Sequence, residues 1–336
     1  MAAALDTKRY DRQIRLWGME TQLRITTTRV LICGVGGLAA EVAKNLVLAG
    51  VGHVTLRDAA SVTLDDLARG GQFLLSAGDA GKNRAEASLP FLRGLNPSVV
   101  VESSVADIRE ATADELGAFD IVLLFELGLG EAVQLAGLAR KARTGVDGHA
   151  GSSKRAREAE EVSAAEQRRV HVMAAGAAGL LGWALFDLGE YSFTETSKKK
   201  GADGETVSET RPGAISYPPL EEALLQVARA KQPADVAKVL SAHRALNLGE
   251  DMRESVRETL RELKLPADTI SDVAADTLAP HASPALAPVC AILGGLIGQE
   301  VIKVISGKDM PIDNFLALDC VSSAPNGGAR VVRLAP

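Results

Sequence analysis

The first part of the chain alternates between short apolar runs and longer segments with apolar residues at helical spacing. Four runs rich in β-branched and aliphatic residues predict strands, and the segments between them predict helices. The predicted strands cover 29–33, 53–58, 99–105 and 119–127, and the predicted helices cover 9–28, 38–50, 83–97 and 130–144. Strands that alternate with helices indicate an α/β, Rossmann-like fold, with a mostly parallel sheet covered by helices on both faces.

Beyond residue 143 the pattern changes several times. We predict a core over 1–143, a flexible insertion over 144–169 that is rich in Gly, Ser and charge, and a continuation of the core over 170–195. A second polar stretch predicts a flexible linker over 196–213, followed by a small, mainly helical segment over 214–282. Residues 283–336 begin with a very apolar helix and predict the closing helix and strands of the core.

Composition narrows the function. No uninterrupted apolar run reaches the roughly 18 residues of a membrane span, so no membrane partner is expected. The start of the chain lacks the apolar region of a signal peptide, which favours a place inside the cell. The net charge of −6, without a basic face, disfavours nucleic acid as a partner. The three cysteines are scattered and form no CxxC pair, and the histidines show no metal-ligand spacing, so no metal site is expected.

One motif carries chemistry. The run "LICGVGGLAAEV" places Gly34, Gly36 and Gly37 between a predicted strand and a predicted helix. Such a loop lets the backbone approach a ligand, and the free N–H groups of the helix favour a phosphate. Asp58 ends the next strand, where an acid that binds ribose belongs. The pattern is weak by itself, because a loop retained for packing and several classes of nucleotide enzyme share it.

The flanking residues are more specific. The series "YDRQIRLWG", "GVGGLAAEVAKNLVLAGVGHVTLRD", "GGQFLL" and "GKNRAEAS", with the tail "LAPVCAILGGLIGQEVIKVIS", resembles the enzymes that activate ubiquitin-like proteins and their ThiF/MoeB-type relatives. Within them it is most similar to the small, Aos-type subunits of SUMO-activating enzymes. The resemblance is weak over 219–280 and absent from 144–161.

The sequence departs from the active members of this family. The resemblance implies a lysine where this chain has Arg84, and a Mg²⁺-binding aspartate where it has Leu127. Glu126 is adjacent, but a neighbour in a strand is expected to face the other way. A planar guanidinium does not replace an ammonium, and leucine cannot bind Mg²⁺. We therefore expect Gly34, Gly36, Gly37 and Asp58 to form a degenerate nucleotide site.

The resemblance also implies what the chain contributes. Arg12 of "YDRQ" matches an arginine that reaches in trans into the ATP site of the other subunit. ATP and Mg²⁺ are then expected in the partner's site, and no cofactor in this chain. The implied partners are the larger catalytic subunit, SUMO and, indirectly, a conjugating enzyme. The implied location is the nucleus and the cytoplasm, since short basic runs at 152–158 and 197–200 suit nuclear import.

Three alternatives stay open at this point. The resemblance also allows the regulatory subunit for another ubiquitin-like modifier, which the greater length of those relatives disfavours. Gly36 and Asp58 allow a self-sufficient homodimeric adenylyltransferase of the ThiF/MoeB type, against which Arg84 and Leu127 speak. The glycine loop also allows a dinucleotide-dependent oxidoreductase, which leaves "YDRQIRLWG" unexplained.

Overall fold

One eight-stranded sheet organises the molecule. The computed structural model describes residues 6–68, 72–142, 169–200, 206–321 and 328–332. The strands lie in the order β10-β9-β6-β5-β4-β1-β2-β3, and the five from β5 to β3 run parallel. Strands β6, β9 and β10 extend the sheet in antiparallel fashion. The bounds are β1 Arg29–Cys33, β2 His53–Arg57, β3 Val100–Ser104, β4 Ile121–Phe125, β5 His171–Ala178, β6 Leu181–Asp187, β9 Phe315–Asp319 and β10 Gly328–Val332.

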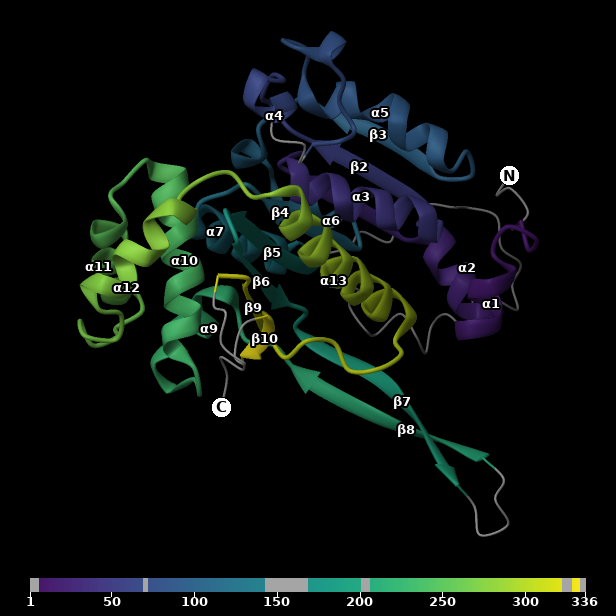
Figure 1. Cartoon of the computed structure of the whole chain (residues 1–336). Coiled ribbons are helices and arrows are strands. Elements are labelled where there is room, and N and C mark those ends of the chain that lie inside the picture. Colours follow the sequence, from purple (N-terminus) through teal and green to yellow (C-terminus); the bar gives the residue numbers. More distant parts are fainter. Residues whose placement is uncertain (1–5, 69–71, 143–168, 201–205, 322–327, 333–336) are drawn as a thin grey trace.

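Helices cover both faces of this sheet (Figure 1), which confirms the predicted α/β class. Successive residues of a strand point to opposite faces, so Val30 and Ile32 of β1 join one apolar core while Leu31 and Cys33 join the other. The first core packs under α3 (Gly37–Ala49), α5 (Arg84–Leu95) and α13 (Ala287–Ser306). The second packs under α6 (Ala113–Gly117), α7 (Leu129–Lys141) and the helices of residues 220–278.

Helix α13 packs directly on α3. A Cβ on Gly294 would lie 2.6 Å from the Cβ of Glu41, and one on Gly298 would lie 3.2 Å from the Cβ of Asn45. Only glycine permits helices to approach this closely. Polar residues interrupt the apolar run, yet an 18-residue window of the helix is long and apolar enough to cross a membrane. Because 56% of that window is buried inside the protein, the helix has the burial of a core helix.

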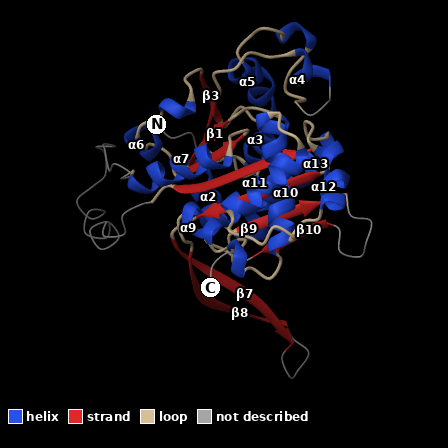
Figure 2. Cartoon of the chain, turned by 90° about the vertical axis from the view of Figure 1, so that its left-hand side faces the viewer, coloured by secondary structure: helices blue, strands red, loops and turns tan. Residues whose placement is uncertain are grey.

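The segment after β6 differs from the prediction in one respect. Residues 196–213 were expected to form a flexible linker, and this prediction is wrong for the part that the structure describes. Strands β7 (Glu190–Lys200) and β8 (Thr206–Ser216) form a separate antiparallel hairpin that projects from the body (Figure 2). The two strands pair with each other along their whole length, from Glu190 opposite Ser216 to Lys200 opposite Thr206. This pairing forms despite the polar composition that predicted a linker.

The remaining helices complete the body. The segment after β8 holds α9 (Leu220–Leu225), α10 (Pro233–Leu248), α11 (Met252–Glu262) and α12 (Asp272–Leu278), and α4 (Leu64–Ala68) follows β2. The insertion predicted over 144–169 lies outside the described residues except for its last residue.

The N-terminal helices α1 (Asp11–Trp17) and α2 (Met19–Thr27) lie at the far end of α3 from its first residue (Figure 1). Buried Tyr10 anchors them, because its hydroxyl accepts a hydrogen bond from Asn96 Nδ2 at 2.8 Å and its ring lies against Gly50. This anchoring fixes where α1 presents its side chains.

Candidate functional site: the glycine loop and its ion-pair cluster

The glycine loop connects β1 to α3 at the carboxyl edge of the sheet. Gly34 has a φ of +78°, and a Cβ there would lie 2.2 Å from the carbonyl oxygen of Phe125. Both the turn and the contact with the end of β4 therefore require glycine. Gly36 precedes the first turn of α3, which has no side-chain cap. The sequence thus predicts the strand–loop–helix geometry correctly, and what fills the loop decides its chemistry.

Asp58 is fully engaged within the protein. Its side chain is 6% exposed, and its Oδ2 accepts a hydrogen bond from the backbone N–H of Val35 at 2.7 Å. Its Oδ1 accepts another from the backbone N–H of Ala60 at 2.8 Å. Arg84 Nη2 lies 3.1 Å from Oδ2. The acid predicted to bind ribose therefore ties the glycine loop to β2 and pairs with an arginine.

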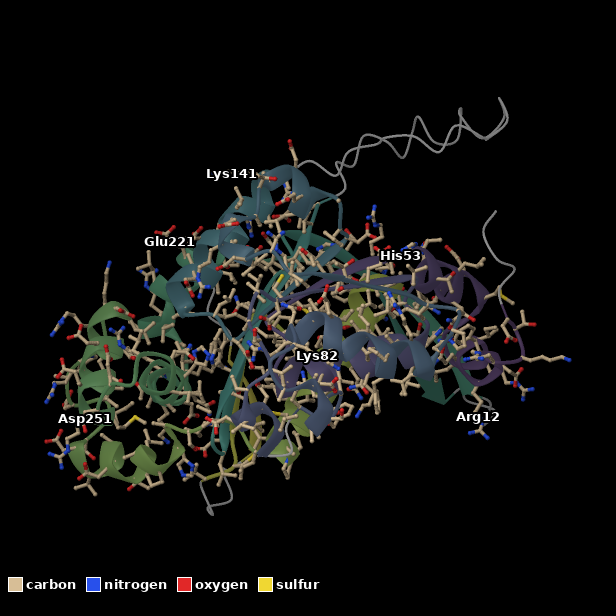
Figure 3. All side chains as sticks on the ribbon, turned by 90° about the horizontal axis from the view of Figure 1, so that it is seen from above. Arg12, His53, Lys82, Lys141, Glu221 and Asp251 are labelled. Atoms are coloured by element: carbon tan, nitrogen blue, oxygen red, sulfur yellow. The ribbon has the colours of Figure 1, made fainter. Side chains whose placement is uncertain are left out.

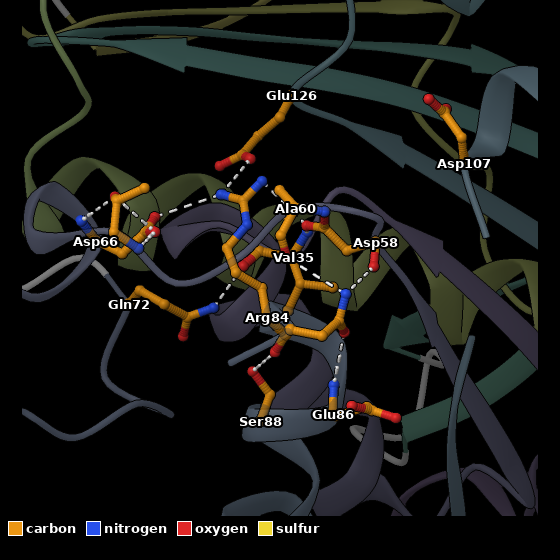
Figure 4. Close-up of polar contacts among 12 residues, drawn as sticks. Val35, Asp58, Ala60, Asp66, Gln72, Arg84, Glu86, Ser88, Asp107 and Glu126 are labelled. Atoms are coloured by element: carbon orange, nitrogen blue, oxygen red, sulfur yellow. Dashed lines mark hydrogen bonds and ion pairs between the residues drawn. The ribbon is translucent and has the colours of Figure 1, made fainter. Parts of the chain in front are cut away.

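Arg84 stands at the centre of a cluster of carboxylates (Figure 4). Its Nη1 lies 3.3 Å from Asp66 Oδ1 and 3.0 Å from Glu126 Oε2, in addition to the pair with Asp58. The side chain is only 15% exposed. Charge-assisted bonds at this depth are screened little by water, so the cluster is a strong internal contact. One guanidinium here forms ion pairs with three carboxylates.

Glu126 does not face away from the loop, so the sequence interpretation was wrong at this residue. Strand β4 ends at Phe125, and Glu126 takes a left-handed backbone conformation with a φ of +55°. Glu126 therefore lies just outside the strand, and the alternation of side chains along β4 does not determine which way it points. Its carboxylate points into the site although the side chain remains 41% exposed. Partial desolvation there raises its pKa above the ordinary value, and the charge of Arg84 opposes the shift. Leu127 is buried and 6% exposed.

A cavity of about 330 Å³ adjoins the cluster, and sequence reasoning missed one of its walls. Gly37, Asp66 and Glu126 line one side, and His243 and Asn247 of α10 line another. His243 is 4% exposed and packs edge-on against Trp183, with 5.2 Å between ring centroids. Burial lowers the pKa of His243 to about 4, so the ring is neutral near pH 7. No motif surrounds these two residues in the sequence, and only the packing of α10 reveals them.

Arg12 lies elsewhere. It is exposed on α1 and extends from the edge of the molecule (Figure 3). Its neighbours are paired, Arg9 with Asp6 and Arg15 with Asp11, whereas Arg12 makes no ion pair or side-chain hydrogen bond with any residue that the structure describes. The glycine loop lies at the first residue of α3 and α1 lies at its last residue. Because α3 has 13 residues, Arg12 is roughly 20 Å or more from the glycine loop.

The residues of the loop do not fit ATP with Mg²⁺. Asp58 is committed to the protein, the carboxylate of Glu126 lies against Gly36, and Leu127 offers no oxygen. Within the described residues, no group of three His, Cys, Asp or Glu side chains is placed to hold a metal ion. The structure therefore brings Gly34, Gly36, Gly37 and Asp58 together and leaves Arg12 apart from them.

Comparison of the chain with known proteins identifies the family to which it belongs. The chain is 31% identical to SUMO-activating enzyme subunit 1 of Xenopus tropicalis in an alignment 354 positions long, gaps included, which covers 95% of this chain and 94% of that protein. The family model of the ThiF family matches residues 10–125. The chain belongs to the ThiF family.

Other relatives match over shorter regions. SUMO-activating enzyme subunit 1 of Homo sapiens is 48% identical over 119 residues, which cover 35% of this chain and 34% of that protein. The DNA damage tolerance protein RHC31 of Saccharomyces cerevisiae is 36% identical over 39% of this chain and 38% of its own. A crystal structure of selenomethionine PaaA matches 98% of this chain and 84% of its own at a TM-score of 0.57. Since that identity is 18%, it supports the ThiF-like fold alone.

Proposed function

We propose that this chain is the non-catalytic subunit of a heterodimeric SUMO-activating enzyme. In this proposal the larger subunit binds ATP and Mg²⁺, adenylates SUMO and transfers it to a cysteine, from which a conjugating enzyme receives it. This chain completes the enzyme and lends Arg12 to the partner's ATP site. Its relatives named SUMO-activating enzyme subunit 1 span nearly its whole length, which supports the pathway.

The position of Arg12 is the main structural support for the proposed role of this chain as the non-catalytic subunit. A guanidinium without a partner among the described residues, on a helix roughly 20 Å from its own glycine loop, cannot serve that loop. It can serve a site on a second protein that docks against α1. There it would place a permanent positive charge beside phosphate oxygens, where charge shifts during adenylation.

Exposed apolar side chains support a protein partner on this side. Leu16 of α1 is 79% exposed, and Leu23 of α2 and Leu48 of α3 are each 49% exposed. Helix α2 packs on α1 and α13, and α13 packs on α3, so these side chains belong to adjacent helices. Large apolar side chains exposed on neighbouring elements are typical of protein interfaces.

The test is the rate of SUMO-dependent ATP–pyrophosphate exchange by the assembled heterodimer. Arg12→Ala is expected to lower it by a factor of about ten to a thousand, because a charge-assisted hydrogen bond contributes about 1.5–3 kcal/mol and more in a transition state. Arg15→Ala is the matched control, since Arg15 is exposed on the same helix and pairs with Asp11 at 3.1 Å. An unchanged rate for Arg12→Ala in a complex that assembles normally by gel filtration would refute the role in trans.

We also propose that the protein acts in the nucleus and the cytoplasm, because the short basic runs at 152–158 and 197–200 suit nuclear import. Residues 152–158 of the basic runs lie outside the described residues, and the side chains of 197–200 are likewise not described. Replacing the lysines of 198–200 by serine and following the protein by fluorescence microscopy tests their part in import.

A further inference from the structure

The side chain of Glu126 occupies the place on the glycine loop where a ligand would approach the backbone. A Cβ built on Gly36 would lie 1.4 Å from Glu126 Oε1, so the carboxylate rests directly on the glycine. On its other side Glu126 Oε2 lies 3.0 Å from Arg84 Nη1 (Figure 4). The carboxylate therefore bridges the loop and the buried guanidinium.

Both partners of this carboxylate have the chemistry of a phosphate site. Gly36 precedes a 13-residue helix without a side-chain cap, so the first N–H groups and the positive end of the helix dipole face this region. Arg84 offers a planar fork of donors, which suits the oxygens of a carboxylate or a phosphate equally well. Its Nε is buried without a hydrogen-bond partner among the described residues. A cavity of about 330 Å³ opens beside Glu126 and Gly37.

We propose that the Glu126 carboxylate is a built-in ligand that closes the glycine loop to phosphate-bearing molecules, and that removing it opens a site for a phosphoryl oxyanion between Gly36 and Arg84. Two effects close the loop. The carboxylate fills the space next to Gly36, and it adds a third negative charge to a cluster in which Asp58 and Asp66 already exceed the single positive charge of Arg84. An incoming phosphate meets both the steric block and like-charge repulsion.

The backbone at Glu126 makes the test variant compatible with the fold. Glu126 has a φ of +55°, a conformation that glycine adopts without strain and asparagine tolerates. Glu126→Gly and Glu126→Asn therefore remove the carboxylate without demanding a new backbone. Asp309→Gly is the matched control, because it removes an exposed acid at a φ of +61°, beyond the opposite end of α13 from the cavity.

The experiment is isothermal titration calorimetry on the full chain alone, with inorganic pyrophosphate, ATP and adenosine as probes. We expect both Glu126 variants to bind pyrophosphate and ATP at least tenfold more tightly than the wild-type chain and Asp309→Gly do. Adding Arg84→Met to Glu126→Gly is expected to abolish the gain. Equal affinity for pyrophosphate and ATP, with none for adenosine, would mean that the oxyanion alone is recognised, and tighter binding of ATP would add a nucleotide contact. Either supports the proposal.

Two outcomes would overturn it. One is binding of ATP or pyrophosphate by the wild-type chain as tightly as by the variants, because the carboxylate would then close nothing. The other is no gain in either variant when circular dichroism shows that it is folded. The inference does not rest on the proposed subunit role. It is measured on the chain alone, whereas Arg12 is tested by exchange in the heterodimer, so the failure of one is distinguishable from the failure of the other.

Discussion

Replacing Arg84 by methionine tests whether the ion-pair cluster stabilises the fold. The change keeps an unbranched side chain of similar length and removes the charge that three carboxylates share. Asp58, Asp66 and Glu126 lie 3.1, 3.3 and 3.0 Å from the guanidinium, and their side chains are 6%, 15% and 41% exposed, so the pairs with the two aspartates dominate the cost. Breaking a buried pair from one side costs about 3–5 kcal/mol, because it leaves an uncompensated charge. Asp58 keeps its two backbone hydrogen bonds, so we expect the lower end, about 3 kcal/mol.

The assay is urea unfolding followed by circular dichroism. With a slope of about 3 kcal/mol per molar urea, the unfolding midpoint of Arg84→Met should fall by about 1 M. Arg109→Met is the matched control: Arg109 also pairs with two carboxylates, those of Asp107 and Glu131, but is 56% exposed. Water and salt screen such a pair, so its loss should cost less than about 1 kcal/mol.

A second substitution tests which carboxylate causes the loss of stability in Arg84→Met. In the Arg84→Met background, Glu126→Gly should recover part of the lost stability, since it removes one unpaired carboxylate and relieves a left-handed backbone. Equal losses for Arg84→Met and Arg109→Met, or no recovery in the double variant, would refute the view that the cluster is a buried, coupled unit.

Two further predictions concern the packing around the site. The pKa of His243 is lowered to about 4, against 6.5 for an ordinary histidine. Between these two pH values the folded chain therefore binds fewer protons than the unfolded chain. The contribution of His243 to the unfolding free energy is complete above pH 6.5, and up to about 3 kcal/mol of it is lost as the pH falls to 4. Proton NMR of the histidine ring measures this pKa, and a native value near 6.5 would contradict the buried placement. Gly294→Ala should cost about 1–3 kcal/mol because its Cβ would lie 2.6 Å from that of Glu41. Gly295→Ala, with nothing within 4 Å, should gain up to about 0.8 kcal/mol, and equal thermal shifts for the two variants would contradict the close packing of α3 and α13.

The sequence predicts the parallel part of the sheet because its strands and helices differ in hydrophobic period. Strand β4 reads as five apolar residues in a row, and all five are buried. The hairpin of β7 and β8 carries no such signal, since its strands pair mainly with each other and much of it lies away from the two cores. A polar hairpin and a polar linker look alike in sequence.

The site was predictable in its residues and less so in its arrangement. The glycine loop and the position of Asp58 at the end of the next strand followed from the motif. The direction of Glu126 did not, because it depends on one backbone turn immediately after β4. Neither did the wall formed by His243, because that wall depends on how a distant helix packs against β5 and β6.

The measurement that tests the central claim most directly is SUMO-dependent ATP–pyrophosphate exchange by this chain alone and by its mixture with the larger subunit of the SUMO-activating enzyme. Because Glu126 and Arg84 fill the glycine loop and Arg12 lies at the other end of α3, we expect no exchange by the chain alone and full exchange by the mixture. Exchange by the chain alone would contradict the account, and would show a self-sufficient adenylyltransferase that uses its own glycine loop.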